Sequence, residues 1–334
     1  MDRRPPTPPG PQREVPAGAR LQSAAGRSPL AMMVAGTLLY GVGPVMIQAS
    51  SVSGPVFSLW RLLAGIPLFA APLPLYVRMG GRWPGRRAWR WALWGGLAFG
   101  IHQVLFTTAL KATSVTDVTL VGTLAPVVTA ILAVPLFGER PGIGFRIWTV
   151  VAMAGASIVI VAASSGPEGD PAGMVMASSN VVFFSLFFLF GKMSRAEMDV
   201  LPFLFGMTCA ASVVVGAVCL ATGQPVGAVT QTDLLLAVGL ALVPGGVAHF
   251  MTTWPMRWVP ANIPALLQLM VPAISGLLAW RLLDEPIEVR HFVGGAITLV
   301  GVAGAVLAPG TRDFASGRST GDRGGAPAEG IAAD

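Results

Sequence analysis

The chain has 334 residues, of which 53% are hydrophobic and 11% are charged, and its formal net charge is +6. This composition excludes a soluble globular protein, because so few charged residues cannot cover the surface of a soluble chain of this length. It does not indicate a nucleic-acid-binding protein either, because the arginines lie in loops and tails rather than on one folded face.

The first segment, residues 1–28, is rich in Pro, Arg, Gly and Ala and has no apolar core. It is interpreted as a disordered tail and not as a signal peptide, which would need an apolar run of its own. Residues 309–334 have a similar composition. They predict a second disordered tail.

Ten apolar runs of about 20 residues each occupy the chain between these tails. A helix of this length crosses roughly 30 Å of hydrocarbon. The runs are continuous rather than alternating, which excludes a transmembrane β-barrel and leaves helices as the spanning structure. The predicted spans are 30–49, 55–76, 91–110, 115–137, 146–163, 173–191, 201–220, 234–253, 261–283 and 289–308.

Positive charge is distributed unevenly over the connections between these spans. If the N-terminus is cytoplasmic, 18 of the 22 Lys and Arg residues lie in cytoplasmic segments, three lie in external segments and Arg61 lies within a span. The cytoplasmic loops of membrane proteins carry an excess of this kind. We therefore predict a multi-pass protein of the cell membrane with both termini in the cytoplasm.

The two halves of the chain are related by a shift of 146 residues, which places Pro126 on Pro272 and Gly155 on Gly301 without a gap. Because each half has an odd number of helices, the second half must enter the membrane upside down. The predicted fold is all-α, with ten transmembrane helices in two inverted five-helix repeats, an arrangement that supports alternating access. Its parts are a cytoplasmic tail at 1–28, a first repeat at 29–163, an external linker at 164–172, a second repeat at 173–308 and a cytoplasmic tail at 309–334.

Pro126 and Pro272 lie at the middle of their predicted helices. A proline removes a backbone donor and frees a carbonyl, and helices interrupted at matching positions of two halves point to a binding site at the membrane midplane. The alternative is a pair of kinks without function, since proline is common in membrane helices.

Several short motifs resemble those of a known family. The segment 109–114 (ALKATS), Pro126 and the segment 138–140 (GER) are similar to the start, centre and end of the EamA repeat of the drug/metabolite transporter superfamily. The segment 284–286 (DEP) of the second half keeps the Glu but lacks the Gly and the Arg. The resemblance covers roughly residues 30–308. It implies secondary transport of small metabolites, often amino acids, with export as the expected direction and a central cavity between the halves.

Arg61 lies about six residues into the second predicted span, roughly 9 Å from the outer edge of the membrane. A charge at this depth is costly and faces a cavity or a partner. One interpretation is a cation that attracts an anionic group of the substrate, such as a carboxylate. The others are extension to the outer interface or an ion pair with Asp117.

Two histidines fall within predicted spans of opposite halves. His102 is followed by Gln103 in the third span, and His249 comes shortly after the Pro-Gly-Gly segment 244–246 in the eighth, which can break a helix and expose carbonyls to a cavity. Histidines here can titrate near neutral pH, or each can simply bond a neighbouring helix. Without a nearby Cys, Asp or Glu they make a poor metal site.

Other polar groups complete the candidate substrate pathway. Each can join helices or line a cavity, and they are Tyr40, Gln48, Asn180 and Gln268. Glu139 and Glu285, at helix ends, are expected to cap the next helix or to pair with Arg rather than to touch substrate. The phenylalanines that crowd the sixth span at 183–190 are expected to face lipid, because that span is aromatic all round.

The predicted function is a carrier, and the alternatives are a membrane-embedded enzyme and a non-transporting membrane scaffold. An enzyme needs a nucleophile with a base, or paired acids, near an interface. The predicted spans contain no His-x-x-Glu-His motif, no Gly-x-Ser-x-Gly motif and no Asp pair. The expected partners are a small-molecule substrate and the lipid bilayer, with a homodimer as an option. Neither a nucleic acid, a metal nor a cofactor is expected.

Overall fold

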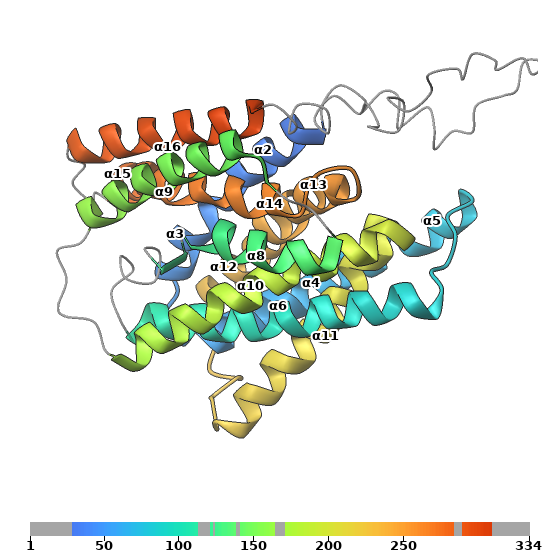
Figure 1. Cartoon of the computed structure of the whole chain (residues 1–334). Coiled ribbons are helices and arrows are strands. Elements are labelled where there is room, and N and C mark those ends of the chain that lie inside the picture. The colour runs from blue at the N-terminus through green and yellow to red at the C-terminus, as the bar shows by residue number, and fades with distance from the viewer. Residues whose placement is uncertain are drawn as a thin grey trace, which may run out of the picture.

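The computed structural model describes residues 29–112, 121–122, 124–137, 141–163, 171–283 and 289–308. Within these ranges all regular secondary structure is helical, which confirms the predicted all-α class for this part of the chain (Figure 1). Both predicted tails, most of the predicted linker, Glu139 and Glu285 lie outside the described residues.

The helices of the first half are built from apolar runs that end at turn-forming residues. Helix α4, for example, starts at Gly54, and Pro55 is its second residue. A proline in the first turn of a helix costs no hydrogen bond. Gly80, in the turn after α5, has a φ of 87°, which favours glycine. The helices are α2 (Pro29–Tyr40), α3 (Val42–Gln48), α4 (Gly54–Ala70), α5 (Leu73–Arg78), α6 (Arg86–Ala112), α8 (Ala125–Phe137) and α9 (Ile143–Ala163).

The second half contains three irregular helical segments among the regular helices that the structure describes. A capping box of Thr230 and Asp233 starts α12, and the Pro-Gly-Gly sequence then widens the helix into a π-helical segment. The elements are α10 (Pro171–Glu197), α11 (Val200–Ala221), α12 (Gln231–Leu242), the π segment η1 (Val243–Ala248), α13 (His249–Thr253), the 3₁₀ turn η2 (Trp254–Arg257), α14 (Asn262–Leu267), the 3₁₀ turn η3 (Gln268–Met270), α15 (Val271–Leu283) and α16 (Val289–Leu307).

Apolar helices long enough to cross a membrane recur along the described chain, so the protein is a multi-pass membrane protein in contact with lipid. Six qualify by length and composition, and they are Pro29–Ile47, Gly54–Arg78, Arg86–Leu110, Val175–Glu197, Val200–Ala221 and Gln231–Arg257. Shorter apolar helices lie at Ala125–Phe137, Ile143–Ile158, Asn262–Ser275 and Phe292–Leu307.

The helices pack in pairs that join the two halves of the chain. Helix α6 lies against α10 and α11, α4 against α11 and α12, and α9 along α16, as Figure 1 shows for α9 and α16. Helix α2 also contacts α13, α3 contacts α15, and α8 contacts α10 and α14. These contacts cross from one half to the other, and the space between the halves is where polar side chains can be enclosed.

Glycines let α9 and α16 approach closely. A Cβ atom on Gly155 would lie 2.4 Å from the backbone nitrogen of Thr298, and a Cβ atom on Gly301 would lie 2.3 Å from that of Ala152. No side chain fits at such distances, so the crossing requires glycine at both positions.

Each of the two matched prolines lies in the first turn of a described helix. Helix α8 starts at Ala125 and α15 at Val271, so Pro126 and Pro272 are each the second residue of a helix. Proline is tolerated there because the amide nitrogens of the first turn have no partner within the helix. The 3₁₀ turn η3 lies between α14 and α15 and ends two residues before Pro272.

Candidate functional site

A cavity of about 220 Å³ lies between the two halves. Its walls come from α2, α3, α4 and α6 of the first half and from α10, α12, η1, α13, η3 and α15 of the second. The predicted pathway residues that line it are Tyr40, Arg61, His102, Gln103, Asn180, His249, Gln268 and Pro272.

Two predicted residues are not placed on this cavity. Pro126 is buried within α8 and is not among the described residues that line the cavity. Gln48 ends α3, and its side chain is outside the part of the chain that the structure describes.

Aromatic rings form much of the cavity wall, and this corrects the expectation that the phenylalanines of the sixth span face lipid. Phe184, Phe187 and Phe188 line the cavity, and Phe187 and Phe188 are buried. Phe99 of α6 meets Phe187 with ring centroids 5.0 Å apart. The side of α10 that carries these rings is turned inward because α6 and α8 pack against it.

His102 is held by a polar and an aromatic contact. Its Nδ1 lies 2.5 Å from Oδ1 of Asn180, so the ring donates to the amide oxygen of a helix in the other half. The ring also stacks on Phe184 at 4.5 Å between centroids. Both polar residues are buried, and their pairing links α6 to α10 at the cavity wall.

His249 is oriented by the irregular backbone of η1. Its Nδ1 lies 3.1 Å from the carbonyl oxygen of Pro244, and because a carbonyl can only accept, Nδ1 is the donor. The Pro-Gly-Gly segment therefore supplies the carbonyl that orients the ring of His249. The other ring nitrogen, Nε2, is buried without a hydrogen-bond partner among the described residues.

Tyr40 packs against His249 from the first half. Its ring meets the imidazole edge-on, with centroids 5.1 Å apart and planes at 85°. The Thr252 hydroxyl donates to the carbonyl of Ala248 at 2.9 Å, so the Tyr40 hydroxyl, 3.1 Å from Thr252 Oγ1, is the donor in that contact. Tyr40 thus helps to fix the imidazole of His249 in the cavity wall.

Among the described residues that line the cavity, Arg61 is the charged one. Its guanidinium carbon lies 5.5 Å from the centre of the Phe99 ring, a cation–π contact. Its Nε is buried without a hydrogen-bond partner in the described ranges. One of the alternatives, a pair with Asp117, concerns a residue outside those ranges.

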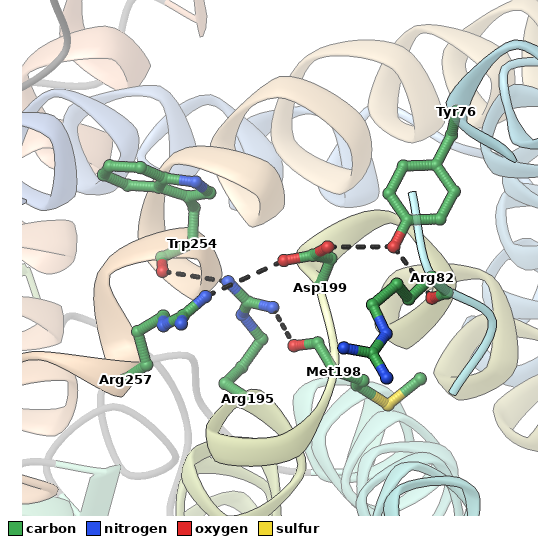
Figure 2. Close-up of polar contacts among 7 residues, drawn as sticks. All are labelled: Tyr76, Arg82, Arg195, Met198, Asp199, Trp254 and Arg257. Atoms are coloured by element: carbon green, nitrogen blue, oxygen red, sulfur yellow. Dashed lines mark hydrogen bonds and ion pairs between the residues drawn. The ribbon is translucent and has the colours of Figure 1, made fainter. Parts of the chain in front are cut away.

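A second polar cluster, which we call the end cluster, lies where α10 and α13 end (Figure 2). Tyr76 donates to Oδ2 of Asp199 at 2.8 Å, and Arg257 Nη1 lies 3.7 Å from Oδ1 of the same carboxylate. Arg195, only 1% exposed, donates to the carbonyls of Met198 and of Trp254. Sequence reasoning counts Arg195 and Arg257 only as loop charges, because their partners Met198, Trp254 and Asp199 carry no motif that marks these contacts.

The end cluster is well separated from the cavity. Arg195 follows Asn180 by 15 residues on α10, which corresponds to about 22 Å along a helix. The two sites therefore occupy different levels of the same helix bundle.

Comparison with known proteins places these features in a family context. Residues 27–161 and 171–307 each match the EamA-like transporter family. An uncharacterized transporter of Archaeoglobus fulgidus is 26% identical over 264 residues, which are 78% of this chain and 90% of the relative. The uncharacterized transporter YwfM of Bacillus subtilis is 26% identical over 231 residues, 66% of this chain and 75% of the relative.

A solved crystal structure shares the fold. It superposes with a TM-score of 0.69 at 18% sequence identity and covers 84% of this chain and 97% of its own. At this identity the similarity concerns the fold alone.

Proposed function

Since the chain belongs to the EamA-like transporter family and is a membrane transporter, we propose that it exports small metabolites across the cell membrane as a secondary transporter. The central cavity is the proposed substrate site, and alternating access is the proposed mechanism. The observation that carries the proposal is the meeting of polar residues from both halves, among them Arg61, His102, Asn180 and His249, on one cavity. Small-molecule sites are concave, apolar in most of their lining and equipped with few polar groups.

Alternating access requires two halves of equal and opposite geometry, and the helix contacts support this arrangement. In the proposed relation the counterparts are α2 and α3 with α10, α4 with α11, α6 with α12 and α13, and α8 with α15. If each helix is exchanged for its counterpart, the contact of α6 with α11 becomes that of α12 with α4. The contact of α10 with α6 becomes that of α2 with α13, and that of α8 with α10 becomes that of α15 with α3. All six contacts occur, as a two-fold relation between five-helix repeats at 29–163 and 173–308 predicts.

Individual residues support the same relation. Gly155 approaches Thr298, and Gly301 approaches Ala152. Adding 146 to Gly155 and subtracting 146 from Thr298 turns the first contact into the second. Two further pairs with this separation line the cavity together, and they are Gln103 with His249 and Gly122 with Gln268. The proposed two-fold axis therefore passes close to the proposed substrate site.

The orientation follows from the charge count, which favours ten spans with both termini in the cytoplasm. In that orientation the end cluster is cytoplasmic. The cavity lining extends to Ile47 and Leu110, near the C-terminal ends of α3 and α6, which lie on the external side. We infer that the end cluster closes the cytoplasmic side in this conformation. Rocking of the halves would break it and open the cavity inward.

Flux through a purified, reconstituted protein tests the proposal. Full-length protein in liposomes should accelerate the movement of at least one compound from a panel of radiolabelled amino acids, organic acids and other small metabolites. Protein-free liposomes and the variant Arg61→Gln are the controls. If no compound moves faster than in protein-free liposomes, in either direction, the carrier function is wrong. That result would favour the alternative of a non-transporting membrane scaffold.

A further inference from the structure

Two unpaired polar atoms belong to side chains that contact the same aromatic ring, that of Phe99. Arg61 Nε and His249 Nε2 are both buried without a hydrogen-bond partner among the described residues. The guanidinium carbon of Arg61 lies 5.5 Å and the imidazole centroid of His249 lies 5.1 Å from the centroid of Phe99. A buried polar group without a partner is costly, and two beside one cavity indicate that a ligand completes them.

The two atoms require opposite partners. Arginine has only donors, so its Nε needs an acceptor. His249 already donates from Nδ1 to Pro244, and in the neutral ring Nε2 is then an acceptor that needs a donor. A hydroxyl group meets both needs, because its oxygen accepts from Arg61 while its proton is donated to His249.

The charge of the lining defines the rest of the ligand. Arg61 contributes one positive charge, and none of the described residues that line the cavity is Asp or Glu. A monoanion neutralises this charge, and a carboxylate matches the planar guanidinium. A zwitterionic amino acid brings an ammonium group for which the described lining offers no carboxylate. The rings of Phe99, Phe184 and Phe187 offer an apolar surface for the remainder of the molecule.

We propose that the cavity binds 2-hydroxycarboxylates with an apolar side chain, the carboxylate on Arg61 and the hydroxyl between Arg61 Nε and His249 Nε2. This inference rests on the proposed function, because it names the substrate class of the same cavity. It narrows that function, since it favours hydroxy acids over the amino acids that the family resemblance suggests.

Three ligands with one carbon skeleton test the inference. Binding of 3-phenyllactate, 3-phenylpropionate and L-phenylalanine to the detergent-purified full chain is measured by isothermal titration calorimetry. The first carries a 2-hydroxyl, the second has no substituent and the third has a 2-ammonium. 3-Phenyllactate should bind at least tenfold more tightly than either of the others. Equal or tighter binding of L-phenylalanine, or no binding of either acid, overturns the proposal.

Variants separate the two contacts. Arg61→Gln should weaken the binding of both acids at least tenfold. Arg61→Lys, which keeps the charge, should weaken their binding less. His249→Phe should remove the advantage of 3-phenyllactate over 3-phenylpropionate, and this ratio is insensitive to a partial loss of folded protein. Arg281→Gln removes an exposed arginine of α15 and should change nothing. A ratio that survives His249→Phe contradicts the hydroxyl contact and leaves water as the partner of Nε2.

Flux in liposomes distinguishes this inference from the proposed function. If 3-phenyllactate binds as expected but is not transported, the binding site stands and the carrier function fails. If other compounds are transported and no hydroxy acid binds, the carrier function stands and the substrate class is wrong.

Discussion

Arg61 in the cavity and Arg195 in the end cluster are both enclosed among apolar helices, yet they have different surroundings. Arg195 donates from both terminal nitrogens to backbone carbonyls, one on α13's extension η2 and one after α10, and only its Nε is unpaired. Arg61 touches an aromatic ring and has an unpaired buried Nε beside a cavity. The comparison teaches that the fold supplies acceptors for the terminal nitrogens of Arg195, whereas the contact described for Arg61 is to an aromatic ring of the cavity wall.

Removing the two arginines should therefore affect stability in opposite ways, and this is the largest expected difference. Arg195→Ala loses two hydrogen bonds from a charged donor and should lower the free energy of unfolding by about 3 kcal/mol. Arg61→Gln should leave it unchanged or raise it, because a charge without an ionic partner is removed. Denaturant unfolding in mixed micelles measures both.

A surface arginine provides the control for this comparison. Arg87 forms a 3.0 Å ion pair with Glu197, and its side chain is 77% exposed. Arg87→Ala should cost much less than Arg195→Ala, since exposed pairs contribute little. A loss for Arg61→Gln as large as that for Arg195→Ala would show that Arg61 is a structural residue.

The second comparison is between the two matched glycines of α9 and α16. Gly155→Ala and Gly301→Ala should each lower the free energy of unfolding by about 2 kcal/mol, because each added methyl group would meet backbone atoms of the partner helix. The two losses should be similar if the halves are related by a two-fold axis. Gly85→Ala, where nothing lies within 4 Å of the added atom, is the matched control.

The membrane helices could be predicted from the sequence because apolar length is a local property. Arg61 and His249 were recognisable for a similar reason, since each is a polar residue within an apolar run. They line one cavity because α4, α6 and α13 all contribute to its wall. The repeat predicts a cavity of this kind between the two halves. What the sequence did not predict depends on distant neighbours. Phe187 faces inward because it packs against Phe99 of α6. Arg195 donates to the carbonyl of Trp254, which is 59 residues further along the chain.

The third prediction concerns the balance between conformations. Tyr76→Phe removes the hydroxyl that binds Asp199 and should weaken the end cluster by about 1 kcal/mol. A change of this size raises the population with an open cytoplasmic end about fivefold, if the end cluster forms only in the closed state. Affinity for a ligand in the cavity should change far less, because the hydroxyl is remote from it.

Cysteine labelling detects this shift. Thr253 is fully buried next to Trp254, and a cysteine in its place should become reactive if the end cluster opens as proposed. The background carries Cys209→Ala and Cys219→Ala, and a membrane-impermeant maleimide is applied to inside-out vesicles. An unchanged labelling rate in Tyr76→Phe would show that the cluster does not control access.

The smallest effect is expected at the ion pair of the end cluster. Arg257 and Asp199 are 3.7 Å apart, and their side chains are 35% and 51% exposed, so water and ions screen the attraction. Arg257→Gln should therefore change the labelling rate by less than about twofold at physiological salt, and the difference from the unmodified protein should vanish near 1 M salt, where the Debye length is about 3 Å. Tyr76→Phe should keep most of its effect there, because its hydrogen bond is short and direct. If Arg257→Gln instead exceeds Tyr76→Phe, closure depends on charge, and Arg257 rather than the Tyr76 hydroxyl is the main contact that holds the cytoplasmic end shut.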